Sequence, residues 1–394
     1  MIAKKMLKYV EGSSVTRAMF EEGKRMAKLY GAENVYDFSL GNPSVEPPKA
    51  VKDSMIEILQ EEKPNKVHGY MNNAGYEEVR AAIAESLNQK FGTSFGEKNI
   101  LMTVGAAGGL NVILKTILDP GDEVIAFAPY FSEYNNYVAN YDGKMVVISP
   151  NIPSFQPNLK EFAEKITAKT KVVIVNTPNN PTGVVYSEKT IQELAKILEE
   201  KQKEFGTAIY LIADEPYREL AYDGVEVPYL TKYYANTVVG YSYSKSLSLP
   251  GERIGYLVIP NEADDFDNLV NAATIANRIL GFVNAPSLQQ LTVAKCLQEA
   301  TDVSAYDTNR RLLYDKLAEL GFECAKPEGA FYMWVKTKEP DDSAFVAKAK
   351  EFHLLLVPGS AFMCPGYVRI AYCVDTEMLK RSFAAFEQLA ESYK

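Results

Sequence analysis

Short hydrophobic runs alternate with amphipathic stretches between about residues 46 and 260. The runs are rich in Val and Ile and are apolar at successive positions, which is typical of strands buried on both faces of a mostly parallel sheet. They lie at residues 100–104, 123–128, 144–149, 171–176, 208–214, 237–242 and 254–259. Amphipathic segments such as 110–118 and 190–205 separate them. The pattern predicts an α/β fold with a large, doubly wound, mostly parallel seven-stranded sheet.

The pattern changes after about residue 283. Long helical periodicities at 287–299, 301–320 and 376–393 bracket two strand-like runs at 330–335 and 367–373, which predicts a smaller α+β domain. The first 45 residues contain one helical stretch, 14–30, followed by an extended segment that we expect to pack against the C-terminal part. We therefore predict a large domain of residues 46–283 and a small domain of residues 1–45 plus 284–394.

Composition excludes several classes of function. Only two histidines are present, and the four cysteines form no CxxC pair, so no metal site is expected and the thiols are expected to be reduced. The 42 basic and 51 acidic residues give a net charge of −9 without a long basic run, so we expect no nucleic-acid partner. No apolar stretch approaches the ~18 residues of a membrane span, and the start lacks a signal-peptide core. A cytoplasmic protein without a membrane partner is expected.

Lys245 lies in the most informative segment, YSYSKSLSLPGERIGY at 241–256. It follows a predicted strand, stands among serines and precedes Arg253 by eight positions. A partly desolvated lysine amine can attack a carbonyl carbon near neutral pH. Hydroxyl groups and a guanidinium suit a phosphate dianion. Taken alone, the segment is also compatible with a surface lysine in a serine-rich loop.

Three further segments follow predicted strands. Asp214 ends the strand at 208–214, where a carboxylate points into the ligand crevice of a doubly wound sheet or caps the next helix. Asn180 lies in NTPNNPTG at 176–183, whose composition also favours a plain turn. The segment GAAGG at 105–109 opens a helix, where backbone N–H groups can approach a phosphate. It lacks both the GxGxxG spacing and the P-loop lysine.

Together these segments resemble the class I/II aminotransferases, the aspartate-aminotransferase-like group of fold-type I pyridoxal-phosphate (PLP) enzymes. The resemblance extends in the same order through nearly the whole chain. Its motifs are Gly41-Asn-Pro, Tyr70-x4-Gly75, Gly105-Ala-Ala, Pro129-Tyr-Phe131, Asn180-Pro-Thr-Gly, Asp214-x-x-Tyr217, Ser242-x-Ser-Lys245, Pro-Gly-x-Arg253, Pro327-x-Gly-Ala-Phe-Tyr and Tyr367-Val-Arg369. It implies that the large domain binds pyridoxal 5′-phosphate.

The resemblance also implies roles at the reacting end of that cofactor. Lys245 would hold PLP as an internal aldimine and later carry a proton between the substrate and the cofactor. Asp214 would keep the pyridine nitrogen protonated, which makes the ring an electron sink. Tyr217 and Asn180 would donate hydrogen bonds to the 3′ oxygen of the ring, and Phe131 would stack on it.

For the phosphate, the resemblance implies a cup made by Arg253 together with hydroxyl and backbone N–H groups. The remaining members of that cup would be Ser242, Ser244, Ala106 and Ala107. Tyr70 resembles the tyrosine that reaches the phosphate from the partner subunit. A homodimer with shared active sites is therefore implied.

Arg369 would bind the substrate α-carboxylate as a bidentate pair, aided by Asn180 and the Gly41 backbone. Relatives that bind a second carboxylate by arginine carry it in a stretch that corresponds to 284–291, and no arginine stands there. Arg278 and Lys115 could reach the pocket from the partner chain, although a surface location is expected for each. Specificity for aspartate is therefore doubtful.

Three functions remain compatible with these motifs. The predicted one is a ping-pong aminotransferase that moves an amino group from an L-amino acid to a 2-oxo acid through a Lys245 Schiff base. A carbon–sulfur β-lyase is the alternative, because the same scaffold supports elimination. A non-catalytic regulator is disfavoured, because Lys245 is intact and no DNA-binding segment is recognisable.

Overall fold

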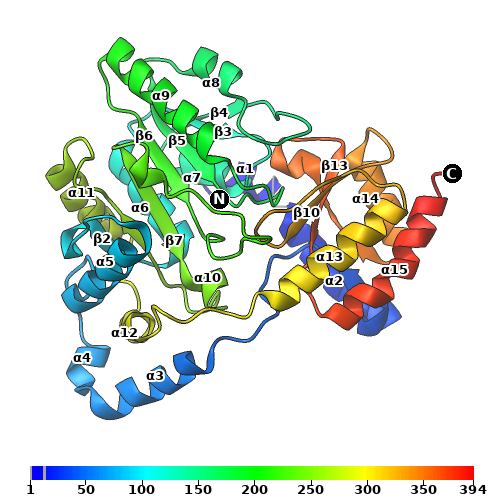
Figure 1. Cartoon of the computed structure of the whole chain (residues 1–394), viewed down its shortest axis with the longest axis horizontal. Helices are drawn as coiled ribbons and strands as arrows, with labels where there is room; N and C mark the ends of the chain where they lie inside the picture. Colours follow the sequence, from blue (N-terminus) through cyan, green and yellow to red (C-terminus); the bar gives the residue numbers. More distant parts are fainter. Residues whose placement is uncertain (1, 12–14) are drawn as a thin grey trace.

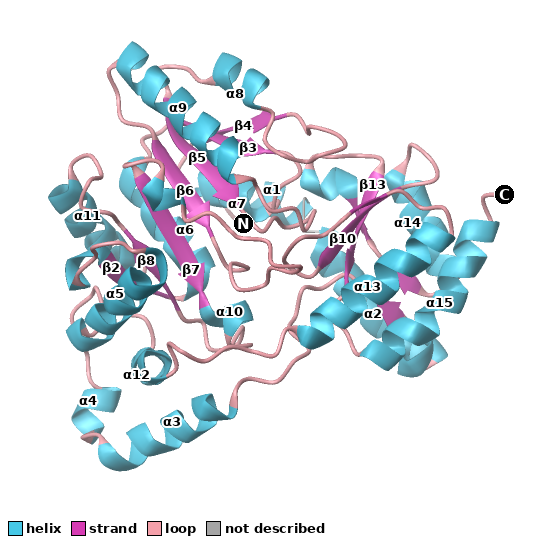
Figure 2. Ribbon diagram, viewed as in Figure 1, coloured by secondary structure: helices cyan, strands magenta, loops and turns pink. Residues whose placement is uncertain are grey.

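Two β-sheets organise the chain, a seven-stranded sheet in the larger part and a four-stranded sheet in the smaller part (Figure 2). The computed structural model describes residues 2–11 and 15–394. In the larger sheet the strands lie in the order β2-β8-β7-β6-β5-β3-β4, and only β8 runs antiparallel to its neighbours. The bounds are β2 (Ile100–Thr103), β3 (Glu123–Phe127), β4 (Lys144–Ile148), β5 (Thr170–Asn176), β6 (Tyr210–Asp214), β7 (Thr237–Ser242) and β8 (Gly255–Val258).

Each predicted hydrophobic run forms one strand of this sheet, and each strand ends within two residues of the predicted position. Successive side chains of a strand point to opposite faces, so β3 sends Val124 and Ala126 into one core and Ile125 and Phe127 into the other. All four are at most 4 % exposed. The prediction of an α/β fold with a mostly parallel sheet buried on both faces is confirmed.

Helices cover both faces of the larger sheet (Figure 1). The core around Ile125 is closed by α3 (Lys49–Glu61), α5 (Glu77–Phe91), α8 (Leu159–Lys165), α9 (Glu188–Phe205) and α12 (Ser287–Lys295). The core around Val124 is closed by α6 (Gly105–Ile117), α7 (Glu133–Asn140) and α11 (Phe266–Ile279). The Ser187 hydroxyl accepts a hydrogen bond from the Thr190 backbone at 3.1 Å and so fixes the start of α9.

The smaller part contains an antiparallel sheet in the order β12-β13-β10-β9. Its strands are β9 (Cys324–Ala325), β10 (Tyr332–Lys336), β12 (Val357–Pro358) and β13 (Tyr367–Ala371). The helices of this part are α2 (Val15–Tyr30), α13 (Ser304–Glu319), α14 (Asp342–Glu351) and α15 (Thr376–Glu391). Position 14, the predicted start of the first helix, lies outside the described residues. Strand β1 (Tyr36–Asp37) pairs with β11 (Leu354–Leu355), so the N-terminal segment packs on the C-terminal part as expected.

Helix α12 follows residue 284, where the sequence places the boundary between the domains. It nevertheless contacts α3 and α5 beside the larger sheet (Figure 1). Leu291 and Val293 of this helix belong to the core that contains the α5 residues Val79 and Ile83. The helix thus packs with the larger part.

The carboxyl ends of β2, β3, β5, β6 and β7 meet at one edge of the larger sheet, since these strands run in the same direction. Strand β8 runs the other way, and its first residue, Gly255, pairs with Ser242 at the end of β7. Arg253, two positions before Gly255, therefore lies at the same edge, although it precedes its strand and does not follow it. This edge of the sheet is where ligands of doubly wound folds bind.

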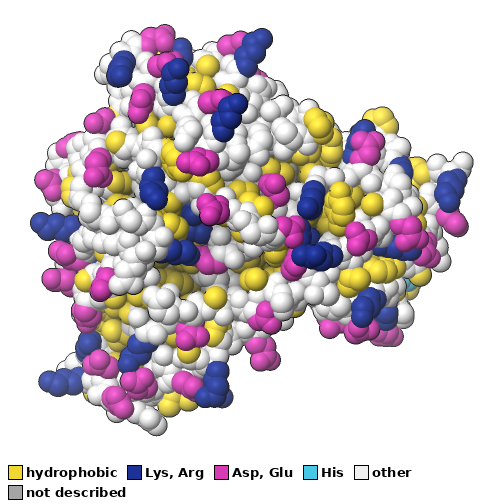
Figure 3. Space-filling view, in the orientation of Figure 1, with side chains coloured by type: hydrophobic (Ala, Val, Ile, Leu, Met, Phe, Trp, Pro, Cys, Tyr) yellow, Lys and Arg dark blue, Asp and Glu magenta, His cyan; other side chains and the backbone are white. Residues whose placement is uncertain are grey.

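The surface shown in Figure 3 carries side chains of both charge signs, interspersed rather than gathered by sign. Within residues 2–11 and 15–394, no helix is both long enough and apolar enough to span a membrane.

Candidate active site

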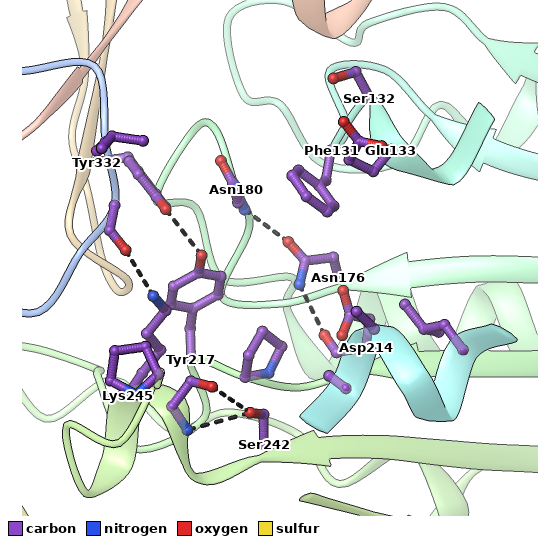
Figure 4. A pocket seen from close by; sticks show the side chains of 18 of the residues that line it. Phe131, Ser132, Glu133, Asn176, Asn180, Asp214, Tyr217, Ser242, Lys245 and Tyr332 are labelled. Atoms are coloured by element: carbon purple, nitrogen blue, oxygen red, sulfur yellow. Dashed lines mark hydrogen bonds between the residues drawn. The ribbon is translucent and has the colours of Figure 1, made fainter. Parts of the chain in front are cut away.

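A cavity of about 550 Å³ lies at the carboxyl edge of the larger sheet and is closed on its other side by residues of the smaller part. It contains every residue predicted for the site except Tyr70. These residues are Gly41, Ala106, Ala107, Phe131, Asn180, Asp214, Tyr217, Ser242, Ser244, Lys245, Arg253 and Arg369. Residues separated by more than 300 positions in the sequence therefore border one space (Figure 4).

Lys245 lies on α10 (Tyr243–Ser246), a single helical turn directly after β7. The Ser242 hydroxyl accepts a hydrogen bond from the Ser244 backbone at 3.2 Å and thereby shapes this turn. Lys245 Nζ donates a hydrogen bond to the Gly41 carbonyl at 2.6 Å and lies 5.2 Å from the centre of the Phe331 ring (Figure 4). The turn thus directs a buried amine into the cavity.

Burial, together with the nearby charges of Arg253 and Arg369, lowers the pKa of Lys245 from 10.5 to about 8, whereas Cys373 opposes the shift. A lysine amine is nucleophilic only when it has lost its proton. The environment therefore makes the neutral amine available close to neutral pH.

Asp214 ends β6, and the Asn176 side chain of the neighbouring strand donates a hydrogen bond to its backbone carbonyl at 2.8 Å. The carboxylate oxygen Oδ2 accepts a hydrogen bond of 2.5 Å from the Tyr134 hydroxyl. The other oxygen, Oδ1, is buried and has no partner in the described part of the chain. Burial, with a smaller contribution from the charge of Glu215, raises the pKa of Asp214 to about 7, while the hydrogen bond from Tyr134 opposes the shift.

A buried acceptor without a donor is costly in a folded protein unless a ligand completes it. Oδ1 of Asp214 is such an atom, and its residue borders the cavity. The carboxylate is thus placed to accept a hydrogen bond from a group bound there.

The N-terminal end of helix α6, which carries a partial positive charge, also borders the cavity. The helix starts at Gly105, whose φ of +68° lies in the left-handed region, and a Cβ at this position would lie 2.7 Å from Nη2 of Arg253. Ala106 and Ala107 follow in the first turn, where backbone N–H groups have no partner within the helix. The helix end and the Arg253 guanidinium together suit an anionic group.

Arg369 approaches the cavity from β13 of the smaller part. Its Nη1 donates to Asn180 Oδ1 at 3.0 Å and its Nη2 to the Ser39 carbonyl at 2.6 Å, while Nε has no partner among the described residues. The guanidinium lies between the rings of Tyr332 and Phe362, 4.5 Å and 4.9 Å from their centres. No carboxylate of the described residues pairs with it, so its charge is available to a ligand.

Two tyrosine hydroxyl groups meet at the cavity, in addition to the Lys245 and Arg369 side chains. The hydroxyl groups of Tyr217 and Tyr332 are 2.9 Å apart (Figure 4). Burial raises the pKa of Tyr332 to about 12 and that of Tyr217 well above 10. Both hydroxyls therefore stay protonated near neutral pH and can donate hydrogen bonds.

Sequence reasoning did not assign three of the polar residues that border or support the cavity. Tyr332 stands in the recognised motif at 327–332, but no role was given to it. Tyr134 lies in the first turn of α7, three positions after Phe131, and no motif marks it in the sequence. Glu133 borders the cavity two positions after Phe131, and no motif marks it in the sequence.

Tyr70 lies outside the cavity and is 94 % exposed. It borders a separate surface recess with Phe282 and Val283. The chain by itself does not bring Tyr70 to the other predicted residues, and its role in a partner's site stays a prediction. Arg278 and Lys115 are exposed and do not border the cavity of their own chain, and a contribution to a partner's cavity stays a prediction.

The sequence profile described as "Aminotransferase class I and II" matches residues 33–386. This chain belongs to the class I and II aminotransferases. A "Probable aspartate/prephenate aminotransferase" from Aquifex aeolicus is 30 % identical over 376 residues, which cover 91 % of each chain. An "Aspartate aminotransferase" from Thermotoga maritima is 28 % identical and covers 96 % of this chain and 97 % of the relative.

Solved structures of aminotransferases have the same fold. An aminotransferase from Eubacterium rectale superposes with a TM-score of 0.97 at 48 % identity, and all of both chains is covered. The aspartate aminotransferase of Thermus thermophilus, solved with maleate, superposes with a TM-score of 0.87 at 28 % identity, over 97 % of this chain and 98 % of the other. The two-part aminotransferase architecture is therefore shared over the full chain.

Proposed function

We propose that this chain is a PLP-dependent aminotransferase, which transfers an amino group from an L-amino acid to a 2-oxo acid in two successive half-reactions. The observation that carries the proposal is the arrangement of charged and polar groups around one cavity. The same space is bordered by the Lys245 amine, whose pKa is lowered, and by Asp214, whose Oδ1 has no partner among the described residues. The positive end of α6 and the guanidinium of Arg369, which pairs with no carboxylate of the described residues, also border it. Membership in the aminotransferase family supports the same conclusion.

The residues of the cavity fit the chemical groups of PLP. The cofactor carries an aldehyde, a ring nitrogen and a phosphate. The cavity provides the Lys245 amine, the unpartnered Oδ1 of Asp214, and the first turn of α6 with Arg253. When bound, PLP supplies an electron sink that stabilises negative charge at the substrate Cα.

The chain's own residues would then position the reactants and move the proton. Lys245 would hold the cofactor covalently until the substrate amine displaces it. Its Nζ would then take the proton from the substrate Cα and deliver it to C4′ of the cofactor. The Tyr217 hydroxyl and the Asn180 side-chain amide would donate hydrogen bonds to the 3′ oxygen of the ring. The hydroxyls of Ser242 and Ser244 would complete the phosphate cup with Arg253.

Arg369 would bind the α-carboxylate of the donor and, in the second half-reaction, that of the 2-oxo acid. Among the described residues its Nε has no partner, and Asn180 and Ser39 hold its other two nitrogens, so the guanidinium plane is fixed before the substrate arrives. The Gly41 backbone lies beside it, and a Cβ at Gly41 would lie 2.0 Å from the Tyr332 hydroxyl. The site is thus organised for a carboxylate next to an amine.

A homodimer completes this proposal. Tyr70 is an almost fully exposed aromatic residue, and Ile275 and Ile279 of α11 are 50 % and 58 % exposed. Contact with another protein surface would remove this apolar area from water, which is favourable. We infer that a second copy of the chain covers them and that Tyr70 reaches the phosphate site of that copy.

Two measurements test the function. Borohydride reduction of the PLP-loaded protein, followed by peptide mapping, should locate the cofactor on Lys245, and a label on another lysine would refute the assignment. Formation of oxo acids from a panel of amino acids should require 2-oxoglutarate for turnover. Steady turnover without an acceptor, with release of ammonia, would instead indicate elimination by a β-lyase.

A further inference from the structure

The two oxygens of the Asp214 carboxylate have different surroundings. Oδ2 accepts the 2.5 Å hydrogen bond from the Tyr134 hydroxyl, whereas Oδ1 is unpartnered among the described residues. The two residues lie on different elements, α7 and β6, and are 80 positions apart. The contact therefore leaves one oxygen bound to the protein and one available at the cavity.

Tyr134 is held rigidly by its neighbours. Its side chain is 1 % exposed. Its ring meets the Phe131 ring edge-on at 5.7 Å and lies parallel to the Tyr130 ring at 6.1 Å. Because Phe131 borders the cavity, one short segment fixes both an aromatic wall of the site and the donor to Asp214.

We propose that Tyr134 is a positioning residue that keeps Asp214 ionised and turns its Oδ1 toward the ring nitrogen of the bound cofactor. This inference rests on the proposed function. A hydrogen bond donated to the charged form of a carboxyl group stabilises that form, and it also selects one orientation of the group. No comparable donor to Oδ1 exists among the described residues, so the effect of Tyr134 is transmitted through Oδ2 alone.

The other titratable groups around Asp214 cannot replace this donor. Glu215 follows it in the chain, and its negative charge favours the protonated form of Asp214. Tyr137 of α7 and Tyr217 after β6 are also buried nearby, but among the described residues only Tyr134 donates a hydrogen bond to the Asp214 carboxylate. The pKa of Tyr134 is raised well above 10 by burial and by Asp214, so its hydroxyl stays a donor at every pH at which the protein is assayed.

The test compares Tyr134→Phe with Tyr130→Phe. The first variant removes only the hydroxyl that binds Asp214. The second removes a buried hydroxyl from the same segment, one that donates to Asn135 at 2.9 Å instead. Carbon-13 NMR of the Asp214 carboxyl in the cofactor-free protein gives its titration midpoint, and fluorescence quenching gives the PLP dissociation constant as a function of pH.

In Tyr134→Phe we expect the Asp214 midpoint to rise by about one pH unit. The ionised fraction at pH 7 then falls from about a half to about a tenth, so PLP affinity at that pH should fall about fivefold. Tyr130→Phe should leave the midpoint within the error of wild type. An unchanged midpoint in Tyr134→Phe, or an equal shift in both variants, would overturn the proposal. Failure of wild-type protein to bind PLP would instead overturn the proposed function, because the midpoint is measured without the cofactor.

If Tyr134→Phe does not fold, as judged by its thermal transition, Tyr134→Met takes its place. Methionine also lacks a donor, and its flexible side chain can fill a buried space of similar size. The expected midpoint shift has the same direction. A midpoint at the wild-type value in that variant would overturn the proposal equally.

Discussion

Arg369 and Asn180 join the two parts of the molecule at the substrate end of the cavity. Arg369 Nη1 donates to Asn180 Oδ1 at 3.0 Å, and both side chains are at most 6 % exposed. Asn180 belongs to the loop after β5 of the larger sheet, whereas Arg369 belongs to β13 of the smaller one. The orientation of the guanidinium therefore depends on how the two parts pack, and it is fixed before a carboxylate binds.

Replacement of Arg369 by lysine should selectively weaken substrate binding. Lysine keeps the charge but loses the planar fork, so about 1.5–3 kcal/mol of charge-assisted hydrogen bonding is lost, or roughly 10- to 100-fold in kcat/KM. Steady-state kinetics with several donors should show the loss mainly in KM. The exposed Arg381→Lys serves as the matched control. A normal KM in Arg369→Lys would contradict the assignment of the carboxylate site.

Lys245 should react as an amine with a midpoint near pH 8. Its pKa in the folded chain is lowered to about 8, so the neutral, nucleophilic fraction increases as pH rises through 8 instead of through ~10.4. The rate of covalent capture of PLP by borohydride should follow this curve between pH 6 and 10. The exposed Lys49 peptide provides an internal reference in the same digest. A capture rate that still rises tenfold per pH unit above pH 9 would show that the amine is not perturbed.

Asp214→Asn should stabilise the cofactor-free protein at alkaline pH. The folded pKa of Asp214, about 7, lies above its value of 3.8 in a solvated chain. Its contribution to stability is thus present below pH 3.8 and is lost as pH rises through 7. The variant lacks this loss, so its free energy of unfolding should exceed that of wild type by about 2–4 kcal/mol at pH 8 and by less at pH 5.

Urea unfolding at the two pH values measures this difference. The exposed Asp119→Asn is the control, and its difference from wild type should be the same at both pH values. The same Asp214→Asn variant should lose turnover by roughly 10²-fold, the scale of removing one key electrostatic partner. Greater stability of the variant without a loss of turnover would show that Asp214 has no role in the reaction.

The cavity should favour donors with uncharged side chains over aspartate. In the part of the chain that the structure describes, the only cations that border it are Lys245, Arg253 and Arg369. Each of them already has a proposed role, so none is left to bind a second carboxylate of the substrate. Glu133 also borders the cavity and would repel such a group. We expect kcat/KM for leucine, methionine or phenylalanine to exceed that for aspartate by at least roughly tenfold.

Glu133→Gln should reduce this preference, because it removes the repulsive charge and retains the hydrogen-bonding shape. Glu200→Gln, on the exposed face of α9, should leave the preference unchanged. Aspartate as the best donor of wild type would show that the partner chain supplies the missing cation.

Subunits with different defects should restore each other if the active site is shared. Tyr70→Arg and Lys245→Ala are each expected to be inactive, and a mixed dimer contains one site with both natural residues. Mixing the two after mild dissociation should recover up to about a quarter of wild-type activity, since half of the dimers are mixed and each has one intact site. A catalytically competent monomer, detected by light scattering at assay concentration, would contradict the shared site.

The hydrophobic pattern was sufficient to predict the layered α/β fold, and the motifs were sufficient to predict most of the residues that border the cavity. Strands are recognisable from local hydrophobic runs in the sequence. Asp214 ends one strand and Lys245 lies just after another, so their position at the edge of the sheet follows from the direction of the strands. The chain order of the motifs was sufficient to indicate the family. These are local properties, encoded within a few positions of each residue.

Tertiary structure alone decided which side chains meet across the cavity. The hydrogen bond from Tyr134 to Asp214 spans 80 positions, the Tyr217–Tyr332 contact 115, and the Arg369–Asn180 contact 189. Each depends on how a helix or a second sheet packs against the larger sheet, and packing angles and rotamers leave no periodic signal in the sequence. For the same reason, only the folded chain shows that Asp214 keeps one oxygen free and that Lys245 is buried deeply enough to lose its proton near pH 8.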